Sequence, residues 1–172
     1  MKQILAKLTH RIALRDIVIL SVAVIILTLP FINQAYHWDD RDFIEMARAL
    51  AKDPFQFHLV DYSGRGLFNA IYVFRHPPLL PYYMSMFLRA GGESEPLLHG
   101  AFLIFPLIAV ASMYSLARRF TRRPLAASLL LVFTPGFLVM SHAIMGNIPG
   151  TSLWLADTSL FVGGVDRNSW KL

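Results

Sequence analysis

Apolar residues in this chain gather in long uninterrupted runs. No charged residue occurs in 17–36, in 96–117 or in 124–156. A helix needs about 20 mostly apolar residues to cross the hydrocarbon core of a membrane. The first two runs are therefore each long enough for one spanning helix, and the third is too long for a single one.

The third run has a natural break at 142–150, which contains His142, Asn147, Pro149 and two glycines. We therefore predict two helices joined by a short turn; the second is short, has Asp157 inside it and is closed by Gly163-Gly164. The sequence predicts an all-α integral membrane protein, a single membrane domain over 1–172. It has about four transmembrane helices, over 17–36, 96–117, 125–141 and 151–165.

The first run has one alternative interpretation, a cleaved signal peptide. Both a signal peptide and a membrane anchor begin with basic residues, here Lys2, Lys7, Arg11 and Arg15, followed by an apolar segment. The exit at 33–36 lacks the small-x-small pattern of a cleavage site, and further apolar runs follow. We therefore favour a membrane helix.

Composition excludes several classes of protein. The chain is 55% hydrophobic and only 16% charged, whereas soluble domains are about 25% charged. It has no cysteine, which excludes a disulfide scaffold and a Cys-based zinc site. The net charge of +5 does not indicate nucleic-acid binding, because the basic residues stand at the ends of apolar runs without interleaved aromatic residues.

The distribution of charge predicts the topology. Ten basic residues fall in the short segments 1–16, 118–123 and 166–172, whereas the loop 37–95 has six basic and eight acidic residues. Short basic segments remain in the cytoplasm. We expect a multi-pass protein of the cell (inner) membrane with a cytoplasmic N-terminus and a large external or periplasmic loop.

The loop 37–95 contains two amphipathic segments. Phe43, Met46, Ala47 and Leu50 recur at helical spacing before Asp53-Pro54, and a second segment, 79–88, is rich in Met and aromatic residues. Both patterns are typical of helices that lie in the membrane interface, where membrane lipids would contact their apolar faces.

Asp39 and Asp40 follow the first span and have two interpretations. A carboxylate at the membrane boundary can act as a general base or help to hold a divalent cation. Alternatively, aspartates at the start of a helix cap its free N–H groups and complement its dipole. Spacing alone does not separate the two.

Three further sites carry similar alternatives. Arg75 and His76, before Pro77-Pro78, could contact a phosphate, or Arg75 could be an interfacial arginine before a proline-initiated helix. His142 could be a ligand or base, or only a polar tip at the interface. Asp157 is costly inside a membrane and so suggests function, unless it faces the helix bundle.

In their order, these segments resemble the GT-C glycosyltransferases of the protein O-mannosyltransferase and aminoarabinose-transferase kind. The residues 36–43 (YHWDDRDF) resemble the acidic pair that follows the first span in that family, and 46–50 (MARAL) the next helix. The residues 76–83 (HPPLLPYY) are similar to its basic-Pro-Pro-Leu segment. The residues 116–120 (LARRF) and 145–149 (MGNIP) match later positions.

The resemblance implies transfer of a sugar from a polyprenyl-phosphate carrier to a lipid or protein acceptor on the outer membrane face. It also implies roles for individual residues. Asp39 would be the base or metal-site carboxylate, supported by Asp40, while Arg75 and His76 would approach the phosphate. Tyr82 and Tyr83 would line the sugar or lipid path. The one cofactor that we expect is a divalent cation.

Two features depart from the family pattern. Asn147 stands where an acidic residue is common, which removes a charge that could position the acceptor. Family members are also several times longer, so we expect the chain to be the N-terminal part of such an enzyme and inactive alone. The alternative is a small non-enzymatic membrane protein, or a subunit that binds lipid carriers.

Overall fold

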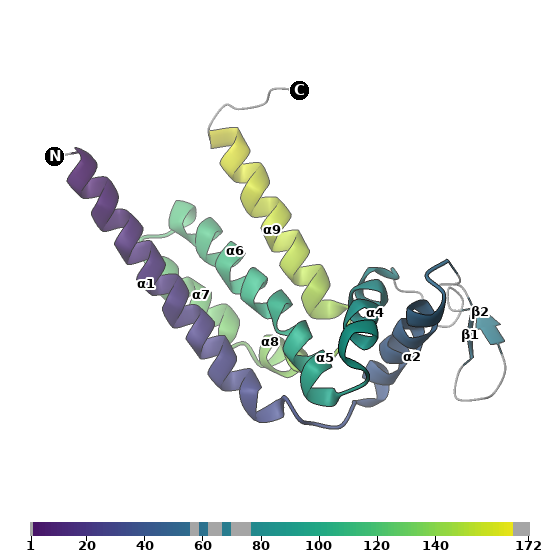
Figure 1. Ribbon diagram of the computed structural model, residues 1–172. Coiled ribbons are helices and arrows are strands. Elements are labelled where there is room, and N and C mark those ends of the chain that lie inside the picture. Colours follow the sequence, from purple (N-terminus) through teal and green to yellow (C-terminus); the bar gives the residue numbers. More distant parts are fainter. Residues whose placement is uncertain (1, 56–58, 62–66, 70–76, 167–172) are drawn as a thin grey trace.

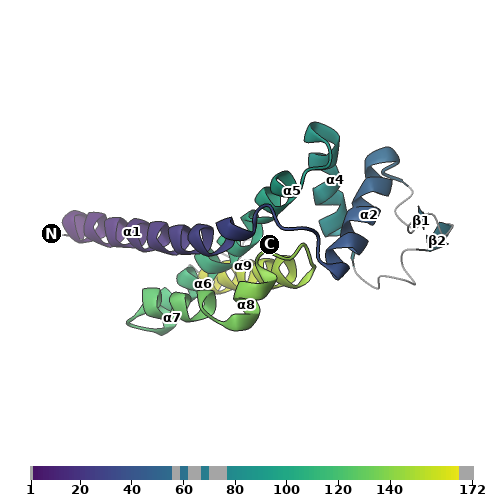
Figure 2. The same cartoon turned by 90° about the horizontal axis from the view of Figure 1, so that it is seen from below.

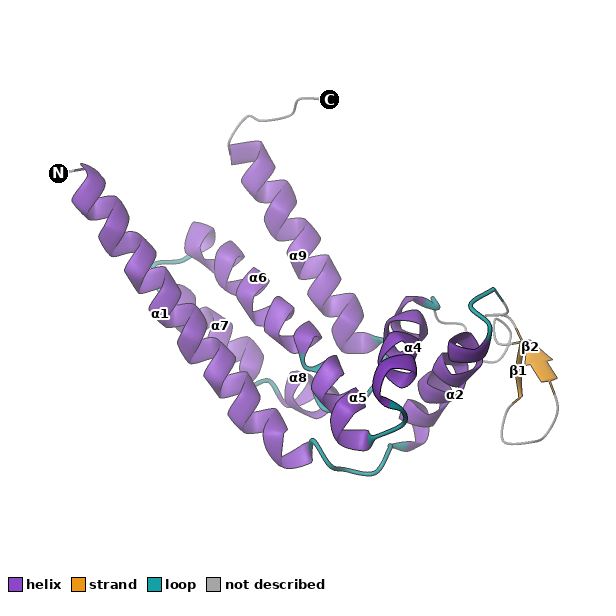
Figure 3. Ribbon diagram, in the orientation of Figure 1, coloured by secondary structure: helices purple, strands orange, loops and turns teal. Residues whose placement is uncertain are grey.

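The computed structural model describes residues 2–55, 59–61, 67–69 and 77–166, which form helices joined by loops and one short hairpin (Figures 1 and 3). The predicted all-helical class is thereby confirmed. The elements are α1 (Lys2–Thr28), the 3-10 helix η1 (Leu29–Phe31), α2 (Trp38–Lys52), β1 (Leu59–Asp61), β2 (Leu67–Asn69), α4 (Leu79–Gly91), α5 (Glu95–Phe102), α6 (Ile104–Phe120), α7 (Pro124–Val132), α8 (Pro135–Met140) and α9 (Asn147–Asp166). Strand β1 pairs antiparallel with β2, with Val60 opposite Phe68.

Two helical segments in the described part of the chain are long and apolar enough to cross a membrane. They are Arg11–Phe31, with a mean hydropathy of 2.5, and Glu95–Phe120, with a mean hydropathy of 1.9. They correspond to the first two predicted spans. The assignment of four spans remains a prediction.

The helices α1, α6, α7 and α9 run side by side and form a bundle (Figure 1). Helix α6 contacts α1, α7 and α9. Its small side chain Ala109 is fully buried, and Leu20 of α1 and Val132 of α7 are buried in the same core. Small residues let helix backbones approach closely where water does not drive association.

Large apolar side chains cover the outside of this bundle. On α1, Val22 and Ile26 are exposed, and on α9 Trp154 and Leu160 are exposed. A soluble monomer rarely shows such an extended apolar surface, so these faces suit contact with lipid. Asp157 is exposed on the same helix and does not face the described bundle.

The first helix ends earlier than predicted. The α-helix of the expected 17–36 span stops at Thr28, and the chain leaves helical structure after Phe31. Pro30 explains this end, because proline lacks the N–H that would continue the helical hydrogen bonds. The six residues 32–37 then connect η1 to α2.

The third predicted helix, 125–141, is wrong as a single element. It is divided into α7 and α8, with Thr134 in an extended conformation (ψ 124°) before Pro135. A residue that precedes proline is disfavoured in the α conformation, which accounts for the break. The last helix begins at Asn147, four residues earlier than predicted, because Pro149 fits in a first helical turn.

The two amphipathic segments of the loop form α2 and α4, which pack against each other. They extend away from the bundle together with α5 (Figure 2). Met46 and Leu50 of α2 form a small buried cluster with Tyr82 of α4. Gly92 ends α4 with φ +73°, a conformation that favours glycine. The location of α2 and α4 in a membrane interface stays a prediction.

Candidate functional site

A polar cluster lies where the segment 32–37 passes between α5 and the loop before α9. It consists of Gln34, Tyr36, Asp40, His99 and His142, which we call the Gln34 cluster. Its members come from three separate parts of the chain. The early end of α1 positions the cluster, because the non-helical segment after Phe31 carries Gln34 and Tyr36 across the base of the bundle.

Gln34 connects the other two parts of the cluster. Its Nε2 donates a hydrogen bond to the backbone carbonyl of His142 at 2.6 Å and lies 3.4 Å from Nε2 of His99. A carboxamide nitrogen has two hydrogens, so both contacts can be hydrogen bonds at once. The second one requires that Nε2 of His99 accepts.

The surroundings of His99 fit that requirement. Its Nδ1 lies 2.9 Å from the backbone carbonyl of Glu95, which can only accept, so Nδ1 carries the proton. In the tautomer with its proton only on Nδ1, Nε2 has a lone pair that can accept from Gln34. The ring is buried and stacks on Tyr36, with ring centroids 5.8 Å apart.

Asp40 is fully buried in the first turn of α2. Its Oδ2 accepts a hydrogen bond from the backbone N–H of His37 at 2.9 Å, which caps the helix. Its Oδ1 has no hydrogen-bond partner among the described residues. Burial raises the pKa of Asp40, and the backbone N–H groups of His37 and Ile144 oppose that rise.

His142 packs on Phe31, with ring centroids 4.2 Å apart and the planes nearly parallel at 13°. Its Nδ1 is buried and has no partner in the described part of the chain. Burial lowers the pKa of His142, and the Asp40 carboxylate opposes the shift. The ring is therefore biased toward its neutral form.

Three buried side-chain polar atoms lack a hydrogen-bond partner among the described residues: Tyr36 OH, Asp40 Oδ1 and His142 Nδ1. All three belong to the Gln34 cluster. Burial also raises the pKa of Tyr36 to about 12, so its hydroxyl remains protonated and able to donate. Buried polar groups are nearly always satisfied, and a gathering of exceptions is typical of a ligand site.

Two cavities flank the cluster on either side of His37. One, of about 190 Å³, is bordered by Gln34, His142 and the apolar side chains of Met140 and Met145. The other, of about 360 Å³, is bordered by Tyr36 and by charged residues of α2. The smaller cavity, with apolar walls and a few polar groups, is typical of small-molecule sites.

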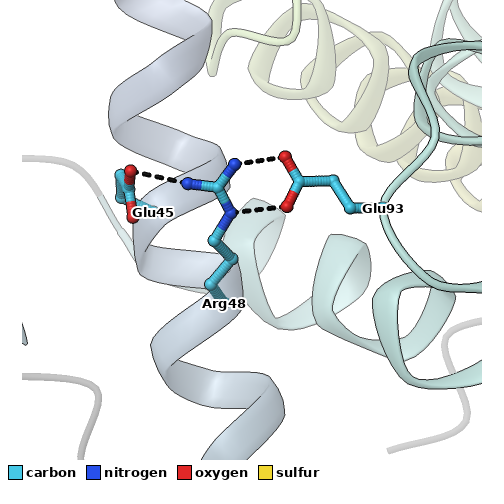
Figure 4. Close-up of polar contacts among 3 residues, drawn as sticks. All are labelled: Glu45, Arg48 and Glu93. Carbon is cyan, nitrogen blue, oxygen red and sulfur yellow. Dashed lines mark hydrogen bonds and ion pairs between the residues drawn. The ribbon is translucent and has the colours of Figure 1, made fainter. Parts of the chain in front are cut away.

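Glu45 and Arg48, which border the larger cavity, form an ion-pair network with Glu93. Figure 4 shows these contacts. Arg48 donates through Nη1 to Glu45 at 2.6 Å and through Nε to Glu93 at 2.7 Å, with a second bond from Nη2 to Glu93. Glu93 lies between α4 and α5, so the bidentate pair fixes α2 to that connection. More than a third of each side chain in the Arg48–Glu93 pair is exposed, so its contribution to stability is at most about 1 kcal/mol.

The predicted catalytic pair is only partly described. Asp39 lies in the first turn of α2, but its side chain is outside the described residues, whereas Asp40 belongs to the Gln34 cluster. Arg75 and His76 both lie outside the described residues. Their predicted approach to a carrier phosphate therefore stays a prediction.

Tyr82, Tyr83 and Asn147 are not among the described residues that line the two cavities. The Tyr82 hydroxyl donates to the backbone carbonyl of Pro54 at 2.7 Å, and the Tyr83 hydroxyl to that of Ala101 at 3.0 Å. The two tyrosines thus anchor α4 to the end of α2 and to α5. Asn147, the exposed first residue of α9, lies 3.6 Å from the sulfur of Met140.

The described residues contain no group of three or more His, Asp or Glu side chains that could hold a metal ion. Sequence reasoning did not single out Gln34, Tyr36 or His99. His99 did offer a clue, because a histidine inside an apolar run is an expensive polar residue in a membrane.

A family model described as dolichyl-phosphate-mannose-protein mannosyltransferase matches residues 75–172, more than half of the chain. Neither a search of curated proteins nor a search of solved structures finds a match.

Proposed function

Because the chain belongs to the dolichyl-phosphate-mannose-protein mannosyltransferase family, we propose that it transfers mannose, or a related sugar, from a polyprenyl-phosphate carrier. The acceptor would be a lipid or a protein at the outer face of the membrane. The family match is the observation that carries this proposal. The Gln34 cluster supports it, because a buried site with three polar atoms that lack partners among the described residues is suited to a hydroxyl-rich sugar.

Within this proposal, Asp39 is the general base that removes the proton from the acceptor hydroxyl. Asp40 has a supporting role, since its cap on the His37 N–H fixes the first turn of α2, which also carries Asp39. If a divalent cation takes part, Oδ1 of Asp40 would help to bind it, because this oxygen has no hydrogen-bond partner among the described residues. The unpartnered Tyr36 hydroxyl and His142 Nδ1 would contact the sugar.

The remaining residues would act on the donor. Arg75 and His76 would neutralise the phosphate that leaves with the carrier, which is where negative charge develops during transfer. Tyr82 and Tyr83 would line the route of the sugar or lipid through their ring faces, because their hydroxyls are engaged by backbone carbonyls. Asn147 would orient the acceptor by hydrogen bonding.

The test is sugar transfer by membranes in which this sequence is expressed within its full reading frame, with polyprenyl-phosphate mannose as donor. Asp39→Asn should lower the rate by about 10²-fold or more, because general-base catalysis contributes about that much. An amide can still cap a helix but cannot accept the proton. Asp42→Asn, the same change three residues along α2, is the matched control and should retain activity. Full activity in Asp39→Asn with normal membrane insertion would contradict the assignment.

A further inference from the structure

A second site lies at the other end of the bundle from the Gln34 cluster. An open cavity of about 630 Å³ lies where the first half of α1, the end of α6 and the start of α7 meet. These three segments are neighbours at the upper end of the bundle in Figure 1. We call this the arginine cavity, because Arg15, Arg118, Arg122 and Arg123 border it.

The one described acidic side chain that borders this cavity is already neutralised within it. Asp16 is buried, and its Oδ1 accepts bonds from Arg15 at 2.9 and 3.1 Å. Its Oδ2 accepts a hydrogen bond from the Tyr114 hydroxyl at 2.9 Å. Both oxygens of Asp16 are satisfied, and the charge of Arg15 is balanced.

The other three arginines that border the cavity are not balanced in this way. Arg118, Arg122 and Arg123 are exposed and form no salt bridge with any other residue that the structure describes. They occupy only six positions, so their guanidinium groups repel one another unless an anion lies between them. Guanidinium forks match the oxygens of a phosphate group in geometry as well as in charge.

Part of the cavity wall is apolar. Ile12 of α1, which is 51% exposed, and Leu125 and Ala126 of α7 line it beside the arginines. Free phosphate has no apolar part that could be buried against these side chains. A phospholipid matches both parts, because its headgroup carries the charge and its acyl chain covers the apolar side chains.

We propose that the arginine cavity binds the headgroup of an anionic phospholipid. Arg118, Arg122 and Arg123 hold the phosphate, and the acyl chain follows Ile12 and Leu125 along the bundle. Basic pockets between transmembrane helices on the cytoplasmic side are suited to such headgroups, and this is the side that the charge distribution predicts for these arginines. The proposal does not depend on the proposed sugar transfer.

The test is titration of the purified protein in a neutral detergent with phosphatidylglycerol, followed by native mass spectrometry of the bound lipid. The variant is Arg118→Gln with Arg122→Gln. Each arginine near an anionic headgroup contributes about fivefold to affinity, so the double variant should bind about 30-fold more weakly. The matched control is Arg11→Gln with Arg119→Gln, which removes two exposed charges at the same end of the bundle but outside the cavity lining.

A large loss in the cavity variant with a small loss in the control supports the site. Equal losses would mean that the arginines attract lipid only by their overall charge, and would overturn it. Phosphatidylcholine binding as tightly as phosphatidylglycerol would also overturn it, as would displacement by inorganic phosphate at similar concentration. If the double variant does not fold, the wild type decides: affinity for phosphatidylglycerol must fall as salt rises, and an unchanged affinity contradicts the proposal.

Discussion

The two ends of the helix bundle treat polar side chains in opposite ways. At the arginine cavity the buried carboxylate of Asp16 has both oxygens satisfied, and the remaining charges are exposed. At the Gln34 cluster the side chains are drawn inside, and three buried polar atoms lack partners among the described residues. The buried carboxylate at the arginine cavity is satisfied by neighbouring side chains, whereas the three buried atoms of the Gln34 cluster are not satisfied by any described residue.

This difference separates two kinds of function. A buried polar atom without a partner costs about 1–3 kcal/mol, so a cluster of them is retained only where something else recovers that cost. A substrate with several hydroxyl groups can do so at the Gln34 cluster. Exposed arginines carry no comparable penalty, and they suit a ligand that stays at the surface of the protein, such as a lipid headgroup.

The largest effect is expected from breaking the connection inside the Gln34 cluster. Gln34→Leu removes the donor to the His142 carbonyl and leaves Nε2 of His99 unpaired. With two buried acceptors unsatisfied, the free energy of unfolding should fall by about 2–4 kcal/mol. Chemical denaturation in detergent micelles, followed by circular dichroism, measures this change.

The exposed neighbour Asn33 supplies the control for that experiment. Asn33→Leu makes the same kind of change at the surface and should alter the free energy of unfolding by less than about 0.5 kcal/mol. If both variants unfold alike, Gln34 does not hold the two parts of the cluster together.

How well the sequence predicts a feature depends on whether residues close together in the chain determine it. The first two spans follow from uninterrupted apolar composition, which does not depend on the rest of the fold. Their ends do depend on single residues: Pro30 stops α1 early and Pro135 divides the predicted third helix. A count of apolar residues measures the length available for a helix, but it does not show where the backbone bends.

The site was predictable only in part, because its contacts are distant in sequence. His99 belongs to the cluster through Gln34, 65 residues away, and no spacing rule connects them. Asp40 shows a different difficulty. Capping and chemistry were treated as alternatives, yet Oδ2 caps the helix while Oδ1 remains unpartnered in the cluster. A single carboxylate has two oxygens and can serve both purposes.

A smaller effect is expected when a buried polar atom at the arginine cavity is left without a partner, as in the Gln34 cluster. Tyr114→Phe removes the hydroxyl that satisfies Oδ2 of the buried Asp16, so the free energy of unfolding should fall by about 1–2 kcal/mol. Tyr83→Phe is the matched control. Its hydroxyl bonds a backbone carbonyl, so about 0.5–1 kcal/mol is expected there. Equal losses would show that Asp16 does not need its partner.

The smallest expected effect tests whether His142 is kept neutral in the folded protein. Burial lowers the pKa of His142 from its usual 6.5, so over the range between the folded pKa and 6.5 the unfolded chain binds more protons. The free energy of unfolding should then increase as pH rises toward 6.5 and level off above it. His142→Gln removes this increase. The raised pKa of Asp40 makes the free energy of unfolding fall as pH rises above 3.8. Asp40 is present in both the wild type and His142→Gln, so the difference between the two pH profiles isolates His142. Identical profiles, measured by denaturation across this range, would mean that the histidine is not held neutral and that its unpartnered nitrogen is reached by water.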